Sequence, residues 1–157
     1  MISVTLPNDR QLNFSHVVFD YNGTLASAGV MSPAVRHKLA ELAQKVHVAV
    51  ITADTFGMAE SQLQDMPGVE LIILPEAATG KDKAQYVHEW GAGNTVAVGN
   101  GVNDQAMFML AGLRICVLGP EGAHAGLLAS ASIVVQSPED ALALLLEPLR
   151  LVATLRP

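Results

Sequence analysis

Short apolar segments rich in β-branched residues alternate with amphipathic segments from about residue 16 to the end of the chain. This alternation is typical of repeated strand–helix units around a parallel β-sheet. The short segments lack strict alternation of apolar and polar residues, as expected for strands that helices cover on both faces. The predicted strands are residues 16–20, 46–52, 69–74, 95–99, 114–118 and 133–135.

Helix start signals lie between these strands. Ser32, followed by proline, is a predicted N-cap that leads into a helix over residues 34–45. Thr79, followed three residues later by aspartate, resembles a capping pair before a helix over residues 83–90. Ser137, followed by proline and two acids, opens the last predicted helix.

Two further apolar segments, residues 2–6 and 11–14, precede the alternating region. The four residues between them, Pro-Asn-Asp-Arg, are turn formers. We therefore expect an N-terminal β-hairpin that is an accessory at the edge of the sheet.

Length and composition favour a single compact domain over residues 1–157. The chain has a mass of 16.5 kDa and shows no linker. Hydrophobic residues make up 50% and charged residues 15%, which supplies a large core and excludes intrinsic disorder. The low charged fraction is also compatible with a homo-oligomer, for which the apolar segment 141–155 is the candidate contact.

Charge and cysteine content exclude several classes of partner. A net charge of −6 disfavours a nucleic-acid groove and an anionic membrane surface as partners. No leader-like start and no apolar stretch of about 18 residues is present, so we expect a soluble, cytoplasmic protein. The single cysteine, Cys116, excludes an internal disulfide and a thiolate metal cluster, and its apolar surroundings predict a buried, inert thiol.

Polar residues gather where the predicted strands end. Asp20 closes the first strand of the sheet, Thr52 closes the second, and the turn 99–104 follows the fourth, while Lys83 begins a helix. Ligands of parallel sheets bind beyond the carboxyl ends of the strands, so these loops should converge. A carboxylate, a hydroxyl, a cation and a polar loop are the groups that phosphoryl transfer through an aspartyl phosphate requires.

These residues resemble the haloacid dehalogenase (HAD) superfamily, and within it the soluble P-type ATPase-like proteins. The resemblance uses four motifs in the family's order: DYNGTL at 20–25, Thr52, Lys83 and GNGVND at 99–104. Together they span residues 16 to about 112. The resemblance implies an α/β fold with a doubly wound, Rossmann-like parallel sheet and an enzyme that hydrolyses phosphate compounds with Mg²⁺ as cofactor.

The resemblance assigns roles to individual residues. Asp20 would be the nucleophile and the first Mg²⁺ ligand, and the backbone carbonyl of Asn22 would be the second ligand. Thr52 and the amide of Gly23 would hold phosphate, and Lys83 would steady both the nucleophile and the phosphate.

The remaining assignments concern the second metal-side loop and the choice of lysine. Asn100, Asn103 and Asp104 would form that loop, with Asp104 as its remaining acid. Lys81 is the alternative to Lys83 as the active-site lysine.

Two positions depart from the family's pattern. Asn22 stands where its phosphatases have a second aspartate that exchanges protons, a change expected to slow the reaction about 10²- to 10⁴-fold. Asn100 stands where a metal-ligating aspartate is usual, which removes one negative charge from the metal site. We therefore expect slow turnover, or a phosphate-sensing regulatory module that turns over poorly or not at all.

The sequence leaves no room for a cap domain. Only residues 26–31 separate the first motif from Ser32, and only a helix and a strand fit between Thr52 and Lys83. An open site suits a phosphorylated small molecule or an exposed phosphate on a macromolecule.

Other interpretations explain fewer residues. The segment 99–104 could be only a tight turn, and as a dinucleotide motif it has the acidic Asp104 at the third glycine position. The histidines lack helical ligand spacing, so a zinc site is disfavoured. A receiver domain would need an acidic pair at the end of its first strand. Asp54 is expected to be a helix cap.

Overall fold

The computed structural model describes residues 1–157, and its centre is a six-stranded parallel sheet in the order β5-β4-β3-β6-β7-β8. All six predicted strands are present, with each boundary within one residue of the prediction. The strands are β3 (His16–Phe19), β4 (His47–Thr52), β5 (Val69–Ile73), β6 (Thr95–Gly99), β7 (Leu113–Val117) and β8 (Ile133–Val135). The doubly wound α/β class is confirmed.

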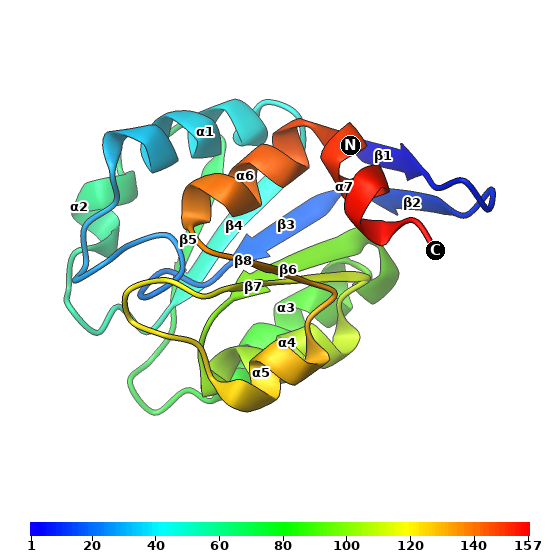
Figure 1. The fold of residues 1–157 in the computed structure, drawn as a ribbon. Helices are drawn as coiled ribbons and strands as arrows, with labels where there is room; N and C mark the ends of the chain where they lie inside the picture. Colours follow the sequence, from blue (N-terminus) through cyan, green and yellow to red (C-terminus); the bar gives the residue numbers. More distant parts are fainter.

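Helices cover both faces of this sheet (Figure 1). The helices α1 and α6 lie on one face, and α3, α4 and α5 lie on the other. The predicted N-caps Ser32, Thr79 and Ser137 are confirmed, since each side chain accepts a hydrogen bond from the first turn of its helix. The helices are α1 (Pro33–Ala43), α2 (Ala59–Leu63), α3 (Gly80–Trp90), α4 (Gln105–Leu110), α5 (Ala125–Ser130), α6 (Pro138–Leu146) and α7 (Pro148–Leu155).

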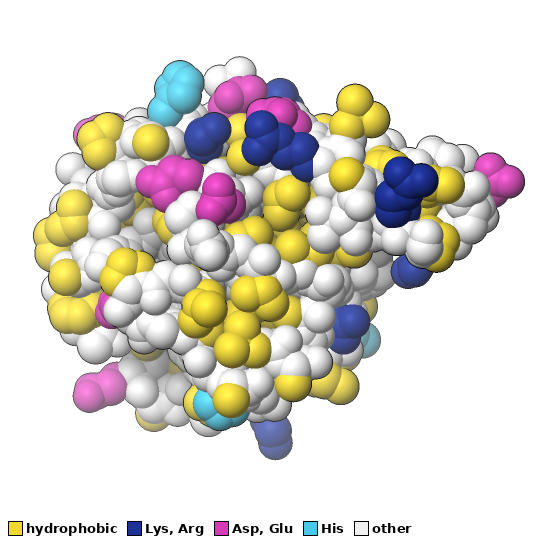
Figure 2. Space-filling model, viewed as in Figure 1, with side chains coloured by type: hydrophobic (Ala, Val, Ile, Leu, Met, Phe, Trp, Pro, Cys, Tyr) yellow, Lys and Arg dark blue, Asp and Glu magenta, His cyan; other side chains and the backbone are white.

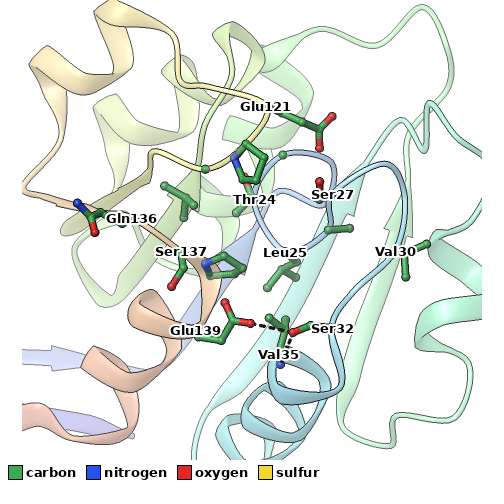
Figure 3. Close-up of a pocket in the computed structure, with 16 residues that line it drawn as sticks. Thr24, Leu25, Ser27, Val30, Ser32, Val35, Glu121, Gln136, Ser137 and Glu139 are labelled. Atoms are coloured by element: carbon green, nitrogen blue, oxygen red, sulfur yellow. Dashed lines mark hydrogen bonds between the residues drawn. The ribbon is translucent and has the colours of Figure 1, made fainter.

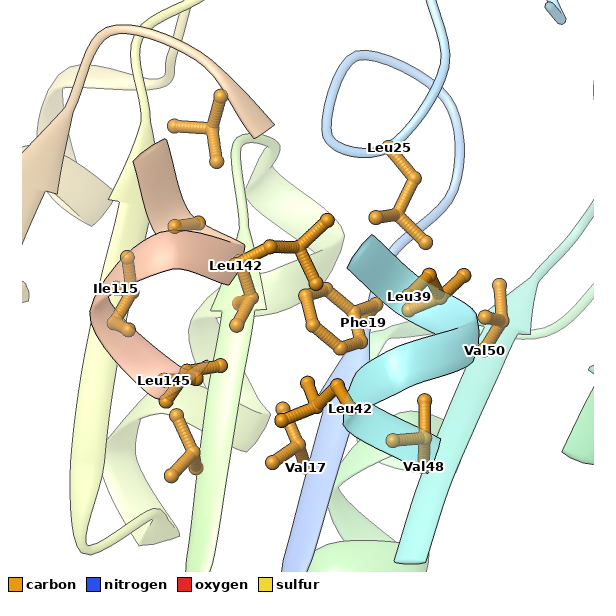
Figure 4. Packing of buried hydrophobic residues seen from close by; sticks show 14 of the residues in the cluster. Val17, Phe19, Leu25, Leu39, Leu42, Val48, Val50, Ile115, Leu142 and Leu145 are labelled. Carbon is orange, nitrogen blue, oxygen red and sulfur yellow. The ribbon is translucent and has the colours of Figure 1, made fainter. Parts of the chain in front are cut away.

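Successive strand residues supply two separate cores, one on each face of the sheet. Val17 and Phe19 pack with Leu39 of α1 and Leu142 of α6 in the larger core (Figure 4). Val18, between them in β3, lies in the smaller core under α3, α4 and α5. Because side chains alternate across a strand, burial of all three requires helices on both faces, as observed.

The N-terminal hairpin is present, but its expected accessory role is wrong. Strands β1 (Ile2–Thr5) and β2 (Gln11–Phe14) form their own antiparallel sheet. Ile2, Val4 and Phe14 are buried in the larger core, and α7 packs against β1. The hairpin alternates apolar and polar residues, so one of its faces extends that core.

The apolar C-terminal segment is used within the chain. Ala141, Leu142, Leu145 and Leu151 are buried in the larger core, so intramolecular packing accounts for much of the segment's apolar character. A homo-oligomer remains a prediction. None of the helices is both long enough and apolar enough to traverse a bilayer.

Candidate active site

The candidate site lies where the strand order reverses. β3 and β6 are neighbours at the centre of the sheet, and the chain leaves them toward opposite edges. This topological switch point is where open α/β sheets bind ligands. Asp20 follows β3 directly and Asn100 follows β6 directly, so the two loops lie side by side at the carboxyl edge.

Lys83 joins two carboxylates beneath this edge. Its Nζ donates to Asp20 Oδ1 at 2.6 Å and to Asp104 Oδ1 at 2.8 Å. Lys83 is only 1% exposed, and both acids are buried as well. The active-site lysine candidate is therefore Lys83, whereas Lys81 is exposed and is not bonded to either acid.

The start of α3 brings Lys83 to the acids. Thr79 accepts from the Lys81 N–H, and its own N–H donates to the Asp82 carboxylate at 2.7 Å, which completes a capping box. Gly80 packs so closely against the loop after β6 that a Cβ there would lie 2.7 Å from the Asn103 carbonyl oxygen. Only glycine fits this approach without movement of the backbone.

The buried charges do not balance, since two carboxylates face one ammonium group. Burial and the neighbouring Asp104 carboxylate raise the pKa of Asp20 to about 7, although Lys83 opposes the rise. Burial lowers the pKa of Lys83, but the attraction of Asp20 and Asp104 outweighs it, so the net shift is upward. The net negative charge of these three groups would favour a further positive charge beside Asp20.

Asp104 organises the loop after β6. Its Oδ2 accepts from the backbone N–H groups of Asn100 and Gly101, both at 2.9 Å, while its Oδ1 binds Lys83. The absence of a Cβ on Gly99 permits this, because a Cβ there would lie 2.5 Å from Asp104 Cγ. Asp104 was expected to be a metal ligand, but it is fully buried and is not among the residues that line the cleft. Its geometry is that of a positioning residue.

The loop after β3 holds a residue that the sequence analysis did not assign to the site. The hydroxyl of Thr24 lies 3.3 Å from Asp20 Oδ2 and 3.1 Å from Asn100 Oδ1, and its single proton can be donated to either acceptor. The expectation for Gly23 is not met, because its N–H donates to the Ala26 carbonyl at 2.8 Å in a tight turn with φ +79°. Thr24 follows Gly23 in the motif at residues 20–25, so this motif could have identified Thr24 as a site residue.

A cleft of about 170 Å³ opens above these groups. Thr52 borders it, and its hydroxyl accepts the Asp54 N–H at 2.9 Å. Asp54 in turn accepts the N–H groups of Met58 and Ala59 at the start of α2, although the N-cap position itself is held by Met58. The residues that line the cleft are Asp20, Asn22, Thr52, Ala53, Thr55, Asn100, Gly101 and Asn103. Ala53 and Thr55 were not predicted.

The cleft fits a hard divalent cation such as Mg²⁺. The side-chain Oδ1 of Asn22 is buried without a hydrogen-bond partner. Asp20 adds a carboxylate and Asn100 an amide oxygen, and oxygen donors of this kind suit Mg²⁺. No group of three or more His, Cys, Asp or Glu side chains is placed to hold a metal, so a cation here would depend on amide, backbone or water oxygens as well.

A larger hollow of about 320 Å³ lies on the other side of the loop after β3 (Figure 3). Its lining includes Glu121 and Glu139, and Ser32 donates to Glu139 at 2.8 Å across it. The two carboxylates disfavour a phosphate there. The smaller cleft, with Asp20 and a buried ammonium group beneath it, remains the candidate active site.

Comparison with known proteins supports the fold. No protein-family profile matches the chain. An uncharacterised protein from Methanocaldococcus jannaschii is 49% identical over 61 residues, which cover 39% of this chain and 66% of that protein. This match spans just under two thirds of the relative's length.

Solved structures match over much more of the chain. A putative HAD family hydrolase from Streptomyces avermitilis aligns with a TM-score of 0.66 at 18% identity, over 83% of this chain and 81% of that one. The 3-deoxy-D-manno-octulosonate 8-phosphate phosphatase of Moraxella catarrhalis, in complex with magnesium, phosphate and its KDO molecule, aligns with a TM-score of 0.70 at 15% identity, over 89% and 90%. The chain therefore has the HAD-like fold that these phosphatases and hydrolases share.

Proposed function

We propose that this protein is a Mg²⁺-dependent phosphohydrolase of the HAD superfamily that acts through a phosphorylated Asp20. The observation that carries the proposal is the position of Asp20 at the end of the central strand β3. It lines the cleft while its Oδ1 is held 2.6 Å from a buried ammonium group. The Moraxella catarrhalis phosphatase, which has the same fold and was solved with magnesium and phosphate, supports the proposal.

Each residue in or beneath the cleft would have a separate role in such a reaction. One oxygen of Asp20 attacks phosphorus, while Lys83 compensates charge on the carboxylate and orients it. Thr52, which lines the cleft, would hold a nonbridging phosphate oxygen. Thr24 orients Asp20 and Asn100 relative to each other through its hydroxyl.

Asp20, Asn22 and Asn100 would hold the cation. Bound there, Mg²⁺ would reduce the repulsion between the carboxylate and an incoming phosphate. Asn103 lies on the rim of the cleft, and Asp104, beneath it, keeps the loop after β6 in place.

The substrate class follows from the open cleft. The segment between Asn22 and Val30 contains only isolated bridges, and the segment between β4 and α3 contains only α2 and β5. No inserted domain covers the cleft. We propose a phosphorylated small molecule or an exposed phosphate on a macromolecule as substrate.

An Asp20→Asn variant tests the proposal. The hydrolysis rate of an aryl phosphate with Mg²⁺ should fall by at least about 10³-fold, because the amide is not a nucleophile. Asp65→Asn, an exposed acid without a bonded partner, is the matched control and should keep the parent rate. Equal rates for Asp20→Asn and the parent would overturn the proposal. Beryllofluoride with Mg²⁺ should bind the parent and stabilise it against thermal unfolding. It should not stabilise Asp20→Asn.

A second candidate is a phosphate-sensing regulatory module with little turnover. The presence of amides at Asn22 and Asn100 favours it, because neither side chain can exchange a proton. Restoring the acid with Asn22→Asp separates the two candidates. A large rise in rate indicates a competent but slow enzyme, and no rise in a folded variant indicates a binding module.

A further inference from the structure

The cleft contains a single titratable side chain. Of the eight residues that line it, only Asp20 carries an ionisable group, and the others offer amides, hydroxyls or no polar side chain. If Asp20 attacks phosphorus, its carboxylate is consumed as the nucleophile. No lining group then remains that could give a proton to the departing oxygen.

Other ionisable groups lie near the cleft but do not line it. The ammonium group of Lys83 is buried beneath the cleft and bonded to two carboxylates. Asp104 is fully buried with both oxygens engaged, and Asp54 accepts N–H groups at the start of α2. His124 is exposed beside Gly126 at the start of α5, and it contributes only a backbone N–H to the Asn100 carbonyl.

We propose that this protein acts on phosphate donors whose leaving group departs without a proton, and that it discriminates against phosphate esters of aliphatic alcohols. Suitable donors are acyl phosphates, phosphoanhydrides and phosphates of acidic phenols. The inference rests on the proposed function, because it concerns the same reaction at Asp20. Beyond that function, it specifies which kind of P–O bond the site can break.

The first step balances without a proton donor. A lone pair of an Asp20 carboxylate oxygen forms the new P–O bond, and the electron pair of the old P–O bond stays on the leaving oxygen. An acyl phosphate thus leaves a carboxylate and an aspartyl phosphate. An alkyl phosphate would leave an alkoxide, which is far too basic to depart unprotonated at neutral pH. In the second step water attacks phosphorus, Asp20 regains its electron pair, and the proton goes to solvent or phosphate.

A series of donors tests the proposal with the unmodified protein. The value of kcat/KM reports the steps up to the transfer to Asp20, so it isolates departure of the leaving group. We expect kcat/KM with Mg²⁺ to fall steeply from acetyl phosphate and 4-nitrophenyl phosphate to phenyl phosphate and then to glycerol phosphate. Similar values for glycerol phosphate and 4-nitrophenyl phosphate would overturn the proposal.

Substitutions at Asn22 provide a second, independent measurement. Asn22→Asp supplies an acid at the edge of the cleft and should raise the ratio of glycerol phosphate to acetyl phosphate kcat/KM by about 10²- to 10⁴-fold. Asn22→Ala supplies none and should leave that ratio unchanged. If Asn22→Asp does not fold, the donor series of the parent still decides.

The outcomes separate this inference from the proposed function. Phosphorylated Asp20, detected by mass spectrometry after acid quench, together with equal rates for all donors would overturn the inference alone. Absence of phosphorylated Asp20 and of hydrolysis with every donor would overturn both. Phosphorylation by acetyl phosphate but not by glycerol phosphate supports both.

Discussion

Lys83 is the residue on which the candidate site depends most. It lies between Asp20 and Asp104, and without it two buried carboxylates would face each other. Removing one partner of a buried ionic group leaves an uncompensated charge, at a cost of about 3–5 kcal/mol.

Lys83→Met should therefore lower the free energy of unfolding by about 3–5 kcal/mol at pH 8. Lys81→Met, an exposed lysine in the same turn of α3, is the matched control and should change it by less than about 0.5 kcal/mol. Urea denaturation of both variants checks the prediction. Equal stability of the two would show that the buried ion pairs contribute little.

Cys116 should be chemically inert in the folded protein. Burial, with the nearby Asp104 carboxylate as a second cause, raises the pKa of its thiol to about 11. We expect no alkylation by iodoacetamide at pH 8 in native buffer and full alkylation in denaturant. Native labelling at the rate of a free thiol would contradict the described burial of β7.

At the level of elements, much of the sheet could be predicted because its strands are short, apolar and bounded by clear turn and cap residues. Much of the candidate site could also be predicted from the sequence, because its residues lie just at the ends of strands or in the first turn of a helix. These residues are Asp20, Thr52, Lys83 and Asn100. The hairpin's contribution to the core could not be foreseen, because it depends on where the separate β1–β2 sheet docks. Long-range packing of this kind leaves no local signal.

The roles of three site residues could not be predicted from the sequence either. Whether Gly23 offers a free N–H depends on the turn that gives it to the Ala26 carbonyl. Whether Asp104 faces the cleft depends on the close approach that Gly99 permits. The bridging position of Thr24 requires the loops after β3 and β6 to be adjacent. Each is a fact about the relative placement of two loops.

The contact between α3 and the loop after β6 is testable at Gly80. Gly80→Ala places a Cβ 2.7 Å from the Asn103 carbonyl oxygen, so the helix and the loop must separate. We expect a loss of about 1–3 kcal/mol in stability and a loss of phosphatase activity.

Gly93→Ala is the matched control, because nothing lies within 4 Å of a Cβ there. It should leave the melting temperature and activity near those of the parent. Unchanged activity in Gly80→Ala would show that the position of α3 does not set the site.

At the scale of the whole molecule, the fold provides an extensive core and an open carboxyl edge of the sheet, where the candidate site lies. Figure 2 shows charged side chains gathered over the upper helices and a group of hydrophobic side chains near the middle of the same face. Leu118 and Val134 are among the exposed hydrophobic residues. Leu118 follows β7, and its N–H donates to the carbonyl of Val135 in the edge strand β8.

Stability of the whole molecule should depend on pH through Asp20. Its pKa is about 7 in the folded protein against an ordinary 3.8, so the folded state binds this proton more tightly than the unfolded state. The resulting stabilisation is complete below about pH 4 and is lost as the pH rises through 7. In EDTA, the free energy of unfolding should therefore fall from pH 5 to pH 8.

Two controls accompany the pH measurement. Asp20→Asn should remove this part of the decline, and millimolar Mg²⁺ should restore stability at pH 8 by binding the folded state. A decline of the same size in Asp20→Asn would assign it to other groups.

The most direct test of the central claim is to locate the phosphoryl group. The protein is mixed with acetyl phosphate and Mg²⁺, quenched in acid, digested and mapped by mass spectrometry. The account predicts a phosphoryl group on the peptide that contains Asp20, and none in Asp20→Asn or in EDTA. A phosphoryl group on another residue, or hydrolysis without any phosphorylated Asp20, would contradict it.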